Sequence, residues 1–214
     1  ITLPDGSVKE FAQGTTPMDV ALSISEGLAR NVISASFNST TIETTTNLTT
    51  DGSLILYTWN NEEGKKAFWH STSHVMAQVI EEFYPGCKLT IGPAIDNGFY
   101  YDVDFGDEKL TDADFKRVED RVLEISREKH EFKMRSATKA EALELYKDNE
   151  FKTELITNLE DGTITFCDHS TFTDLCRGGH IPNTGIIKAM KILSVAGAYW
   201  RGNEKNKQLT RVYG

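Results

Sequence analysis

The sequence predicts an α+β protein of two domains: a small β-rich module over residues 1–60 and a larger α+β domain with an antiparallel sheet over residues 61–214. Short strand-like segments dominate the first part, and the polar stretch NNEEGKK at residues 60–66 separates it from the rest. Beyond that stretch, helical patterns and hairpin patterns occur in separate runs. Such separate runs are typical of α+β folds rather than of doubly wound parallel sheets.

The first domain has the pattern of a β-grasp, ubiquitin-like fold. Residues 1–11 (ITLPDGSVKEF) are two alternating apolar stretches joined by Pro-Asp-Gly, which favours a hairpin. Thr16 and Pro17 then fit the N-cap and the first position of a helix. Strand-like pieces follow in the segments SASFN, TTIETTTN and SLILYTW. This order, two strands, a helix and further strands, predicts the β-grasp arrangement.

The second domain is expected to begin with a helix that Pro85 and Gly86 end. A strand pair is predicted over residues 88–105, with its turn at Asn97-Gly98. Two further helices are marked by N-terminal capping boxes, and the first of them carries an apolar stripe. The capping pairs are Thr111 with Asp114 and Thr138 with Glu141, and the stripe is Phe115, Val118, Val122 and Ile125. Residues 154–170 are interpreted as a hairpin around Asp161-Gly162, and residues 185–202 as strand-like.

The charge distribution argues against a general nucleic-acid binder, because the net charge is −9 and such affinity comes largely from neutralised phosphates. Residues 176–214 nevertheless carry seven basic side chains against one acidic, so this segment is +6 and the rest is −15. Either one face meets an anion, or the segment is a solvated basic tail. Three cysteines and no apolar run long enough for a bilayer favour a soluble, cytoplasmic protein in a reducing compartment.

Four candidate functional residues stand in two pairs of equal spacing, His70-x3-His74 and Cys176-x3-His180. The first pair lies one helical turn apart, so both imidazoles can point at one volume. Three nitrogens and one thiolate suit tetrahedral zinc. Catalysis without metal is also open, because histidine moves protons near neutral pH and a cysteine beside Arg177 can have a lowered pKa.

Four motifs extend this pattern into a resemblance. HSTSH, IGPAIDNGFYYDVDF, DLCRGGHIPNTG and KILSVAGAYWRGNEKNKQLTRVYG occur in the order seen in bacterial-type threonyl-tRNA synthetases. The resemblance covers the whole chain: residues 1–60 are similar to the TGS domain and residues 61–214 to the editing domain, which is related to that of alanyl-tRNA synthetase. One departure is Gly179, where the family more often has proline, and we expect a looser turn there.

The resemblance implies a proofreading hydrolase that cleaves the seryl ester from mischarged tRNA(Thr). Serine lacks only one methyl of threonine, and one methyl is worth about 1–3 kcal/mol, so a second pocket that excludes threonine is needed. It further implies that the parent enzyme attaches threonine to tRNA(Thr) with ATP, Mg and a zinc ion, in a catalytic core absent from this segment. We expect the segment itself to be a monomer without a cofactor, and the full enzyme a cytoplasmic homodimer.

The resemblance also assigns roles to residues. It implies a catalytic set and a substrate-binding set: His70, His74, Lys152, Cys176 and His180, and Tyr101, Asp174 and Arg177. We expect Lys152 and one histidine to hold the hydrolytic water, His70 to contact the terminal ribose, and Asp174 to bind the seryl ammonium. The four His/Cys side chains are expected to work without a metal.

The sequence also allows other functions for the two domains. The four His/Cys side chains can instead hold structural zinc in a module that docks the tRNA acceptor arm without catalysis, using the basic segment for phosphates. The first domain can be a regulatory ligand-binding module. Outside the candidate site, Cys87 and Cys167 are expected to be partly buried, and His130 and His169 to lie on the surface.

Overall fold

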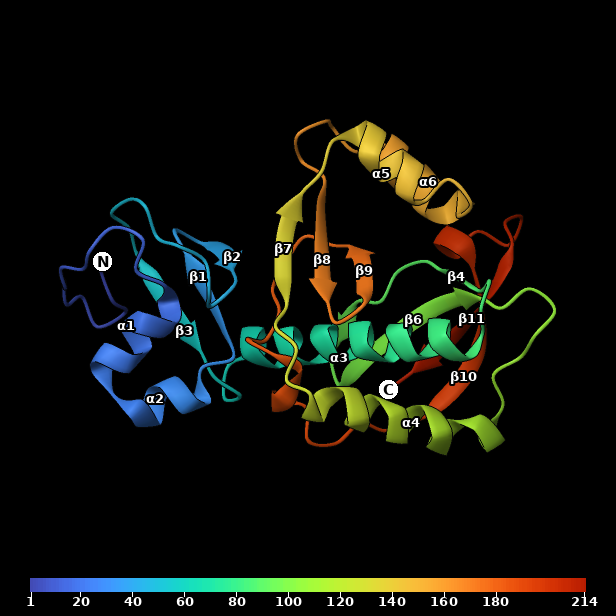
Figure 1. The fold of residues 1–214 in the computed structure, drawn as a ribbon, viewed down its shortest axis with the longest axis horizontal. Helices are drawn as coiled ribbons and strands as arrows, with labels where there is room; N and C mark the ends of the chain where they lie inside the picture. The colour runs from blue at the N-terminus through green and yellow to red at the C-terminus, as the bar shows by residue number, and fades with distance from the viewer.

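The computed structural model describes all 214 residues and shows a small N-terminal body beside a larger one (Figure 1). The elements of the small body are α1 (Pro17–Ile24), α2 (Glu26–Asn31), β1 (Ser34–Phe37), β2 (Thr40–Ile42) and β3 (Leu54–Tyr57). Its antiparallel sheet has the order β2-β1-β3. The helices cover this sheet, as in a β-grasp fold. The hairpin predicted for residues 1–11 is reduced to one bridge, between Thr2 and Val8.

The larger body has two antiparallel sheets and two long helices. Its elements are α3 (Glu62–Phe83), β4 (Lys88–Leu89), β5 (Ala94–Ile95), β6 (Gly98–Asp104), α4 (Asp112–Arg127), β7 (Lys133–Ser136), α5 (Lys139–Leu145), α6 (Glu150–Thr157), β8 (Thr165–His169), β9 (Phe172–Leu175), η1 (Thr184–Ile186), β10 (Ser194–Tyr199), η2 (Trp200–Gly202) and β11 (Gln208–Tyr213). One sheet has the order β10-β11-β6-β4, with β5 added to β6, and the other has the order β7-β8-β9. The α+β expectation is confirmed.

Helix α3 lies at the centre of the larger body, with α4 alongside it (Figure 1). Its middle turns are buried from Ser71 to Ile80, and 25 buried apolar residues form one core around it. Val118, Val122 and Ile125 of α4 pack into this core, as the apolar stripe predicted. Burial of this kind, more than intrinsic propensity, is what stabilises such helices.

The polar stretch at residues 60–66 is not a free linker, because α3 already begins at Glu62. Gly64 lies so close to the end of β3 that a Cβ there would be 2.1 Å from the carbonyl oxygen of Thr58. On the small body's side, Ile33 is part of the large core. Trp59 packs edge-on against Phe68, with ring centroids 5.2 Å apart. The two bodies therefore meet in a packed joint.

The predicted hairpin at residues 154–170 is wrong in its first half. Residues 150–157 form α6, whose N-terminus is capped by the Asn149 side chain accepting the N–H of Lys152. Phe151 and Leu155, and likewise Lys152 and Ile156, are four positions apart, and this helical spacing outweighs the strand-like composition of the segment. Gly162 does have a positive φ of 85°, so the predicted turn exists, but it joins a helix to β8.

In the segment predicted as strand-like, only residues 194–199 form a strand, β10. None of the helices combines the length and apolar character that crossing a bilayer requires.

Candidate active site

Helix α3 presents two imidazoles to the same volume. His70 is half-buried and His74 is 2% exposed, one turn further along. The Nδ1–H of His70 donates to the carbonyl oxygen of Gly92 at 3.3 Å, and the Ser73 hydroxyl donates to the same oxygen at 2.8 Å. Gly92 is required here, because a Cβ would lie 2.1 Å from the ring of Tyr101. The hydrogen bond to the Gly92 carbonyl therefore fixes the orientation of the His70 ring.

The second pair, Cys176 and His180, lies in the turn that follows β9. Asp174 lies on β9, and the backbone N–H of Cys176 donates to Thr165 on β8 at 3.0 Å. Gly178 and Gly179 have φ values of +97° and +88°, in the left-handed region that favours glycine. Proline cannot adopt such a φ. The turn at Gly179 is thus a distinct, hydrogen-bonded conformation rather than the looser turn expected from the sequence.

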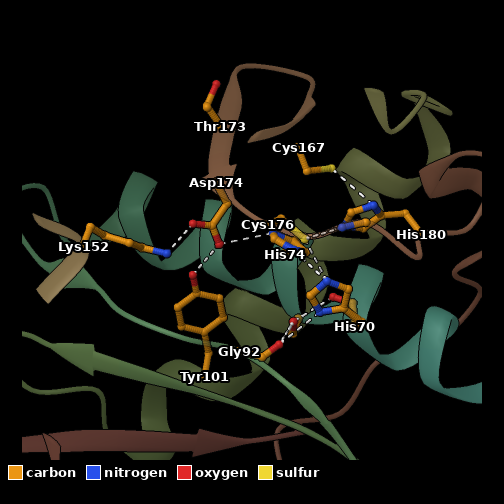
Figure 2. A network of polar contacts seen from close by, with 12 residues as sticks. His70, His74, Gly92, Tyr101, Lys152, Cys167, Thr173, Asp174, Cys176 and His180 are labelled. Atoms are coloured by element: carbon orange, nitrogen blue, oxygen red, sulfur yellow. Dashed lines mark hydrogen bonds and ion pairs between the residues drawn. The ribbon is translucent and has the colours of Figure 1, made fainter. Parts of the chain in front are cut away.

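These two segments bring His70, His74, Cys176 and His180 together, and we call them the quartet (Figure 2). Their donor atoms all lie within 4.8 Å of one another. Cys176 Sγ is 3.1 Å from His70 Nε2 and 3.4 Å from His180 Nε2, and the Nε2 atoms of His70 and His74 are 3.3 Å apart. The equal spacing of the two pairs in the sequence therefore corresponds to one cluster in space.

The surroundings within the quartet favour the charged forms of Cys176, His74 and His180. Burial alone would raise the pKa of the Cys176 thiol, but hydrogen bonds from His180, His70 and His74 hold it well below its usual range. Burial likewise would lower the pKa of His180, whereas contacts with Cys167, Cys176 and Glu43 raise it well above its usual value. The pKa of His74 is raised by Asp174 and Cys176 against the opposing effect of burial.

A second cluster, the Asp174 network, adjoins the quartet at His74. Both Asp174 and Lys152 are nearly inaccessible, at 3% and 2% exposure, and the Lys152 ammonium donates to Asp174 Oδ1. The Tyr101 hydroxyl donates to Asp174 Oδ2 at 2.5 Å, and His74 Nδ1 lies 3.3 Å from the same oxygen. Burial would raise the pKa of Asp174, but Lys152 and His74 hold it below the usual range, so the carboxylate stays ionised.

Both clusters border one cavity of about 520 Å³, lined by residues of α3, α6, β9 and the Thr90–Pro93 segment. Six of the eight predicted site residues line it: His70, His74, Lys152, Asp174, Cys176 and Arg177. Tyr101 and His180 do not; both are fully buried behind the lining residues. Arg177 is exposed at the cavity and forms no ion pair, so its guanidinium is free for an anion.

The quartet has a donor set that suits a tetrahedral zinc ion. Tetrahedral zinc with nitrogen and sulfur ligands separates its donor atoms by roughly 3.3–3.8 Å, from bond lengths of about 2.0–2.3 Å. Three of the six donor–donor separations in the quartet are 3.1–3.4 Å, close to this range, and the others are within 4.8 Å. His70 and His180 also point their Nδ1 atoms at oxygen acceptors, Gly92 and Glu43, as zinc-binding histidines do. The residues present therefore fit the metal in both donor type and orientation.

The basic segment is largely neutralised within its own domain. Four of its seven basic side chains form ion pairs: Lys191 with Glu119, Arg201 with Glu154, Lys207 with Asp104 and Arg211 with Asp102, at 2.5–2.9 Å. A general phosphate-binding face would need these charges free. Arg177, Lys188 and Lys205 are the members without an ion pair, so the anion-binding capacity of the segment is concentrated in few residues.

The sequence predicted His169 to lie on the surface, and this prediction is wrong: the residue is only 2% exposed. Neither ring nitrogen has a hydrogen-bond partner, and the ring packs against Phe132 and Phe172. Burial and the neighbouring His74 and His180 lower its pKa to about 3, so it is neutral at neutral pH. Its position on β8 between apolar rings, which a five-residue strand pattern does not reveal, explains the error. Cys167, expected to be partly buried, is fully buried, and Cys87 is half-buried as predicted.

Sequence reasoning missed Glu43 entirely. This residue follows β2 in the small body, yet its carboxylate contacts the backbone and ring of His180. Its separation of 137 positions from His180 left no local signal that could have revealed the contact.

Comparison with known proteins gives the class of these two bodies. Residues 1–58 match the family described as the TGS domain, and residues 164–213 match the threonyl and alanyl tRNA synthetase second additional domain. Residues 164–213 are thus similar to a domain described for threonyl and alanyl tRNA synthetases.

The whole chain aligns with curated proteins named threonine–tRNA ligase. It is 81% identical to that of Flavobacterium psychrophilum over 214 residues, 52% to that of Cytophaga hutchinsonii over 216, and 46% to that of Bacteroides thetaiotaomicron over 216. Each alignment covers 100% of this chain but only 33%, 34% and 33%, respectively, of the length of these three relatives. The chain spans about a third of the length of these relatives and corresponds to the TGS and second additional domains of threonine–tRNA ligases.

Proposed function

We propose that this chain hydrolyses the ester between serine and the terminal adenosine of tRNA(Thr), as the proofreading part of a threonine–tRNA ligase. The observation that carries the proposal is the cavity on which the quartet and the Asp174 network converge. Ester hydrolysis requires a positioned water, a proton acceptor and a site for each end of the aminoacyl group. The residues around the cavity offer all of these.

Asp174 is the proposed anchor for the seryl ammonium. Its carboxylate is held ionised, and it lines the cavity while Lys152 and Tyr101 occupy part of its accepting capacity. A carboxylate offers about four lone-pair sites, so one more donor can be accepted. Because the anchor is already fixed by its partners, little freedom is lost when the substrate binds.

Lys152 and His74 are proposed to hold the hydrolytic water. Both contact Asp174 and both line the cavity, so a water between them would lie beside the anchored aminoacyl group. Lys152 has further N–H donors beyond the one used on Asp174, and these can polarise the water or the developing oxyanion. His70, which is half-buried at the opening, is placed to contact the terminal ribose, and Arg177 to contact a phosphate.

Discrimination against threonine would come from the size of the pocket. The extra methyl of threonine would have to be accommodated by the side chains around the bound aminoacyl group, and overpacking of this kind costs about 1–3 kcal/mol. The serine ester would therefore be hydrolysed preferentially, which is the second step of a double sieve.

A zinc-containing module that only docks the acceptor arm is the second candidate. The donor set of the quartet suits zinc, which, with all four side chains as ligands, would supply a structural cross-link. The ion-paired basic segment weighs against the docking role.

At the level of the whole enzyme, we propose that the relatives' name extends to the protein from which this chain derives. It would attach threonine to tRNA(Thr) with ATP and Mg, as a cytoplasmic homodimer with zinc in a catalytic core outside this chain. The division at residues 60 and 61 is our proposal for where the two domains meet.

A deacylation assay tests the proposal. The chain is incubated with saturating seryl-tRNA(Thr) and, separately, threonyl-tRNA(Thr), and bound metal is measured on the same sample. We expect hydrolysis of the seryl ester at least about tenfold faster than that of the threonyl ester. No hydrolysis above background would contradict the function. Full rates in both His70→Ala and Lys152→Ala would contradict the assigned roles.

A further inference from the structure

The small body contributes one buried acidic side chain to the candidate site. Glu43, 8% exposed, accepts three hydrogen bonds from the turn after β9. The backbone N–H of Gly179 donates to Oε1 at 2.9 Å and that of His180 to Oε2 at 3.0 Å. The His180 Nδ1–H donates to Oε1 at 3.1 Å. All three donors belong to the larger body, so this carboxylate joins the two bodies at the quartet.

Glu43 is the sole acceptor for these two backbone N–H groups. Buried N–H groups without an acceptor are costly, and Gly179 and His180 are both buried. The left-handed Gly178-Gly179 pair therefore has its conformation fixed from the other body. A side chain at Gly179 would also press on Thr41, since its Cβ would lie 3.3 Å from Thr41 Cγ2.

The same carboxylate sets the orientation of the His180 ring. An ionised carboxylate only accepts, so the ring must carry a proton on Nδ1, and its Nε2 faces Cys176 Sγ at 3.4 Å. The ring also stacks on His70 and Phe132, with centroids 4.9 Å and 5.2 Å away. Stacking fixes the plane of the ring, whereas the hydrogen bond to Glu43 fixes its rotation within that plane.

We propose that Glu43 is a positioning residue of the candidate active site, through which the docked N-terminal module holds His180 and the Gly178-Gly179 turn in place. The inference rests on the proposed hydrolase function. Through Glu43, the N-terminal module would support the hydrolysis by holding His180 in place, without contacting the substrate. The packed joint formed by Ile33 and Trp59 keeps Glu43 within reach of the turn.

The test compares Glu43→Gln with wild type in the full chain. Glutamine keeps the size of the side chain, but its amide group replaces one acceptor oxygen with a donor, so one N–H of the turn loses its partner. We expect kcat for seryl-tRNA(Thr) to fall about tenfold with KM within about twofold, since a small misplacement of a site can cost up to about 10²-fold. Amide hydrogen exchange at Gly179 and His180 is expected to accelerate about tenfold or more.

Glu10→Gln is the matched control, because Glu10 is exposed in the same module. It should leave kcat, KM and exchange at wild-type values. Glu43→Ala should reproduce or exceed the effects of Glu43→Gln, and its melting curve reports whether the chain still folds. If Glu43→Gln keeps the wild-type kcat, the positioning role is overturned, even where exchange accelerates.

The two proposals fail separately. If wild type hydrolyses no seryl-tRNA(Thr), the proposed function fails, and the ring ¹⁵N resonances of His180 together with the exchange rates decide the inference. Unchanged resonances and unchanged exchange in Glu43→Gln would then overturn it.

Discussion

The Asp174 network and the quartet share His74 but differ in how completely their polar groups are satisfied. In the network, the Asp174 carboxylate has an ammonium and a hydroxyl as donors, both buried. In the quartet, the contacts are longer, at 3.1–3.4 Å, and one member, His70, is half-buried at the cavity. The difference predicts that removing a donor from the network costs stability as well as activity, whereas removing His70 from the quartet costs mainly activity.

The largest effect should come from Lys152→Ala, which leaves the Asp174 carboxylate buried without its ammonium. Breaking a buried ion pair from one side costs about 3–5 kcal/mol, so the free energy of unfolding should fall by that amount. Denaturant unfolding followed by circular dichroism measures it. Lys205→Ala, which removes an exposed lysine without an ion pair, should change stability by less than about 0.5 kcal/mol. A loss below 1 kcal/mol in Lys152→Ala would remove the distinction between the two clusters.

His70→Ala should show the opposite profile. Its ring is half-buried and its hydrogen bonds to Gly92 and Cys176 are lost, so the free energy of unfolding should fall by about 1–2 kcal/mol, less than for Lys152→Ala. Hydrolysis of seryl-tRNA(Thr) should fall about 10²-fold, as expected for a group in the reacting volume. Steady-state deacylation and denaturant unfolding on the same preparation check both parts. An activity loss matched by an equally large loss of stability would mean that the quartet also maintains the fold.

Tyr101→Phe sharpens the comparison within the network, because it removes only the hydroxyl that donates to Asp174 at 2.5 Å. A hydrogen bond to a charged group is worth about 1.5–3 kcal/mol, so we expect a loss of about 2 kcal/mol, smaller than for Lys152→Ala. Thermal and denaturant unfolding measure it. Tyr199→Phe is the control, since Tyr199 is 43% exposed. Equal stability of both variants would show that the hydroxyl contributes nothing.

The smallest effect concerns pH and His169, which borders both clusters. Its folded pKa of about 3 lies below the ordinary value of 6.5, so the unfolded chain binds the extra proton as pH falls below about 6.5. Wild type should therefore lose about 1 kcal/mol between pH 6.5 and 5.5 relative to His169→Phe. Melting curves of both proteins across this interval test the sign. Parallel curves would mean that His169 is not held neutral by burial.

Local patterns predicted much of the fold. The capping boxes at Thr111 and Thr138 are present, because capping depends on residues three positions apart. The helix at residues 150–157 was not predicted, because the turn at Gly162 outweighed the helical spacing of Phe151 with Leu155. A turn residue shows where the chain reverses, but not which elements it joins.

The candidate site was predictable only in part, for a physical reason. His70 and His74 are one helical turn apart, so their convergence follows from α3 alone. The Lys152–Asp174 pair and the His180–Glu43 contact depend on how separate elements pack, and single-sequence patterns carry no such information. The burial of His169 belongs to the same class.

The joint at Gly64 has a mechanical consequence. Helix α3 runs unbroken for 22 residues from the border of the N-terminal module through His70 and His74, a length of about 33 Å at 1.5 Å per residue. Since Gly64 packs directly on Thr58, no slack segment separates the module from this helix. If the module rotated as a rigid body, α3 would therefore rotate with it and would shift His70 and His74, because no flexible linker separates the two.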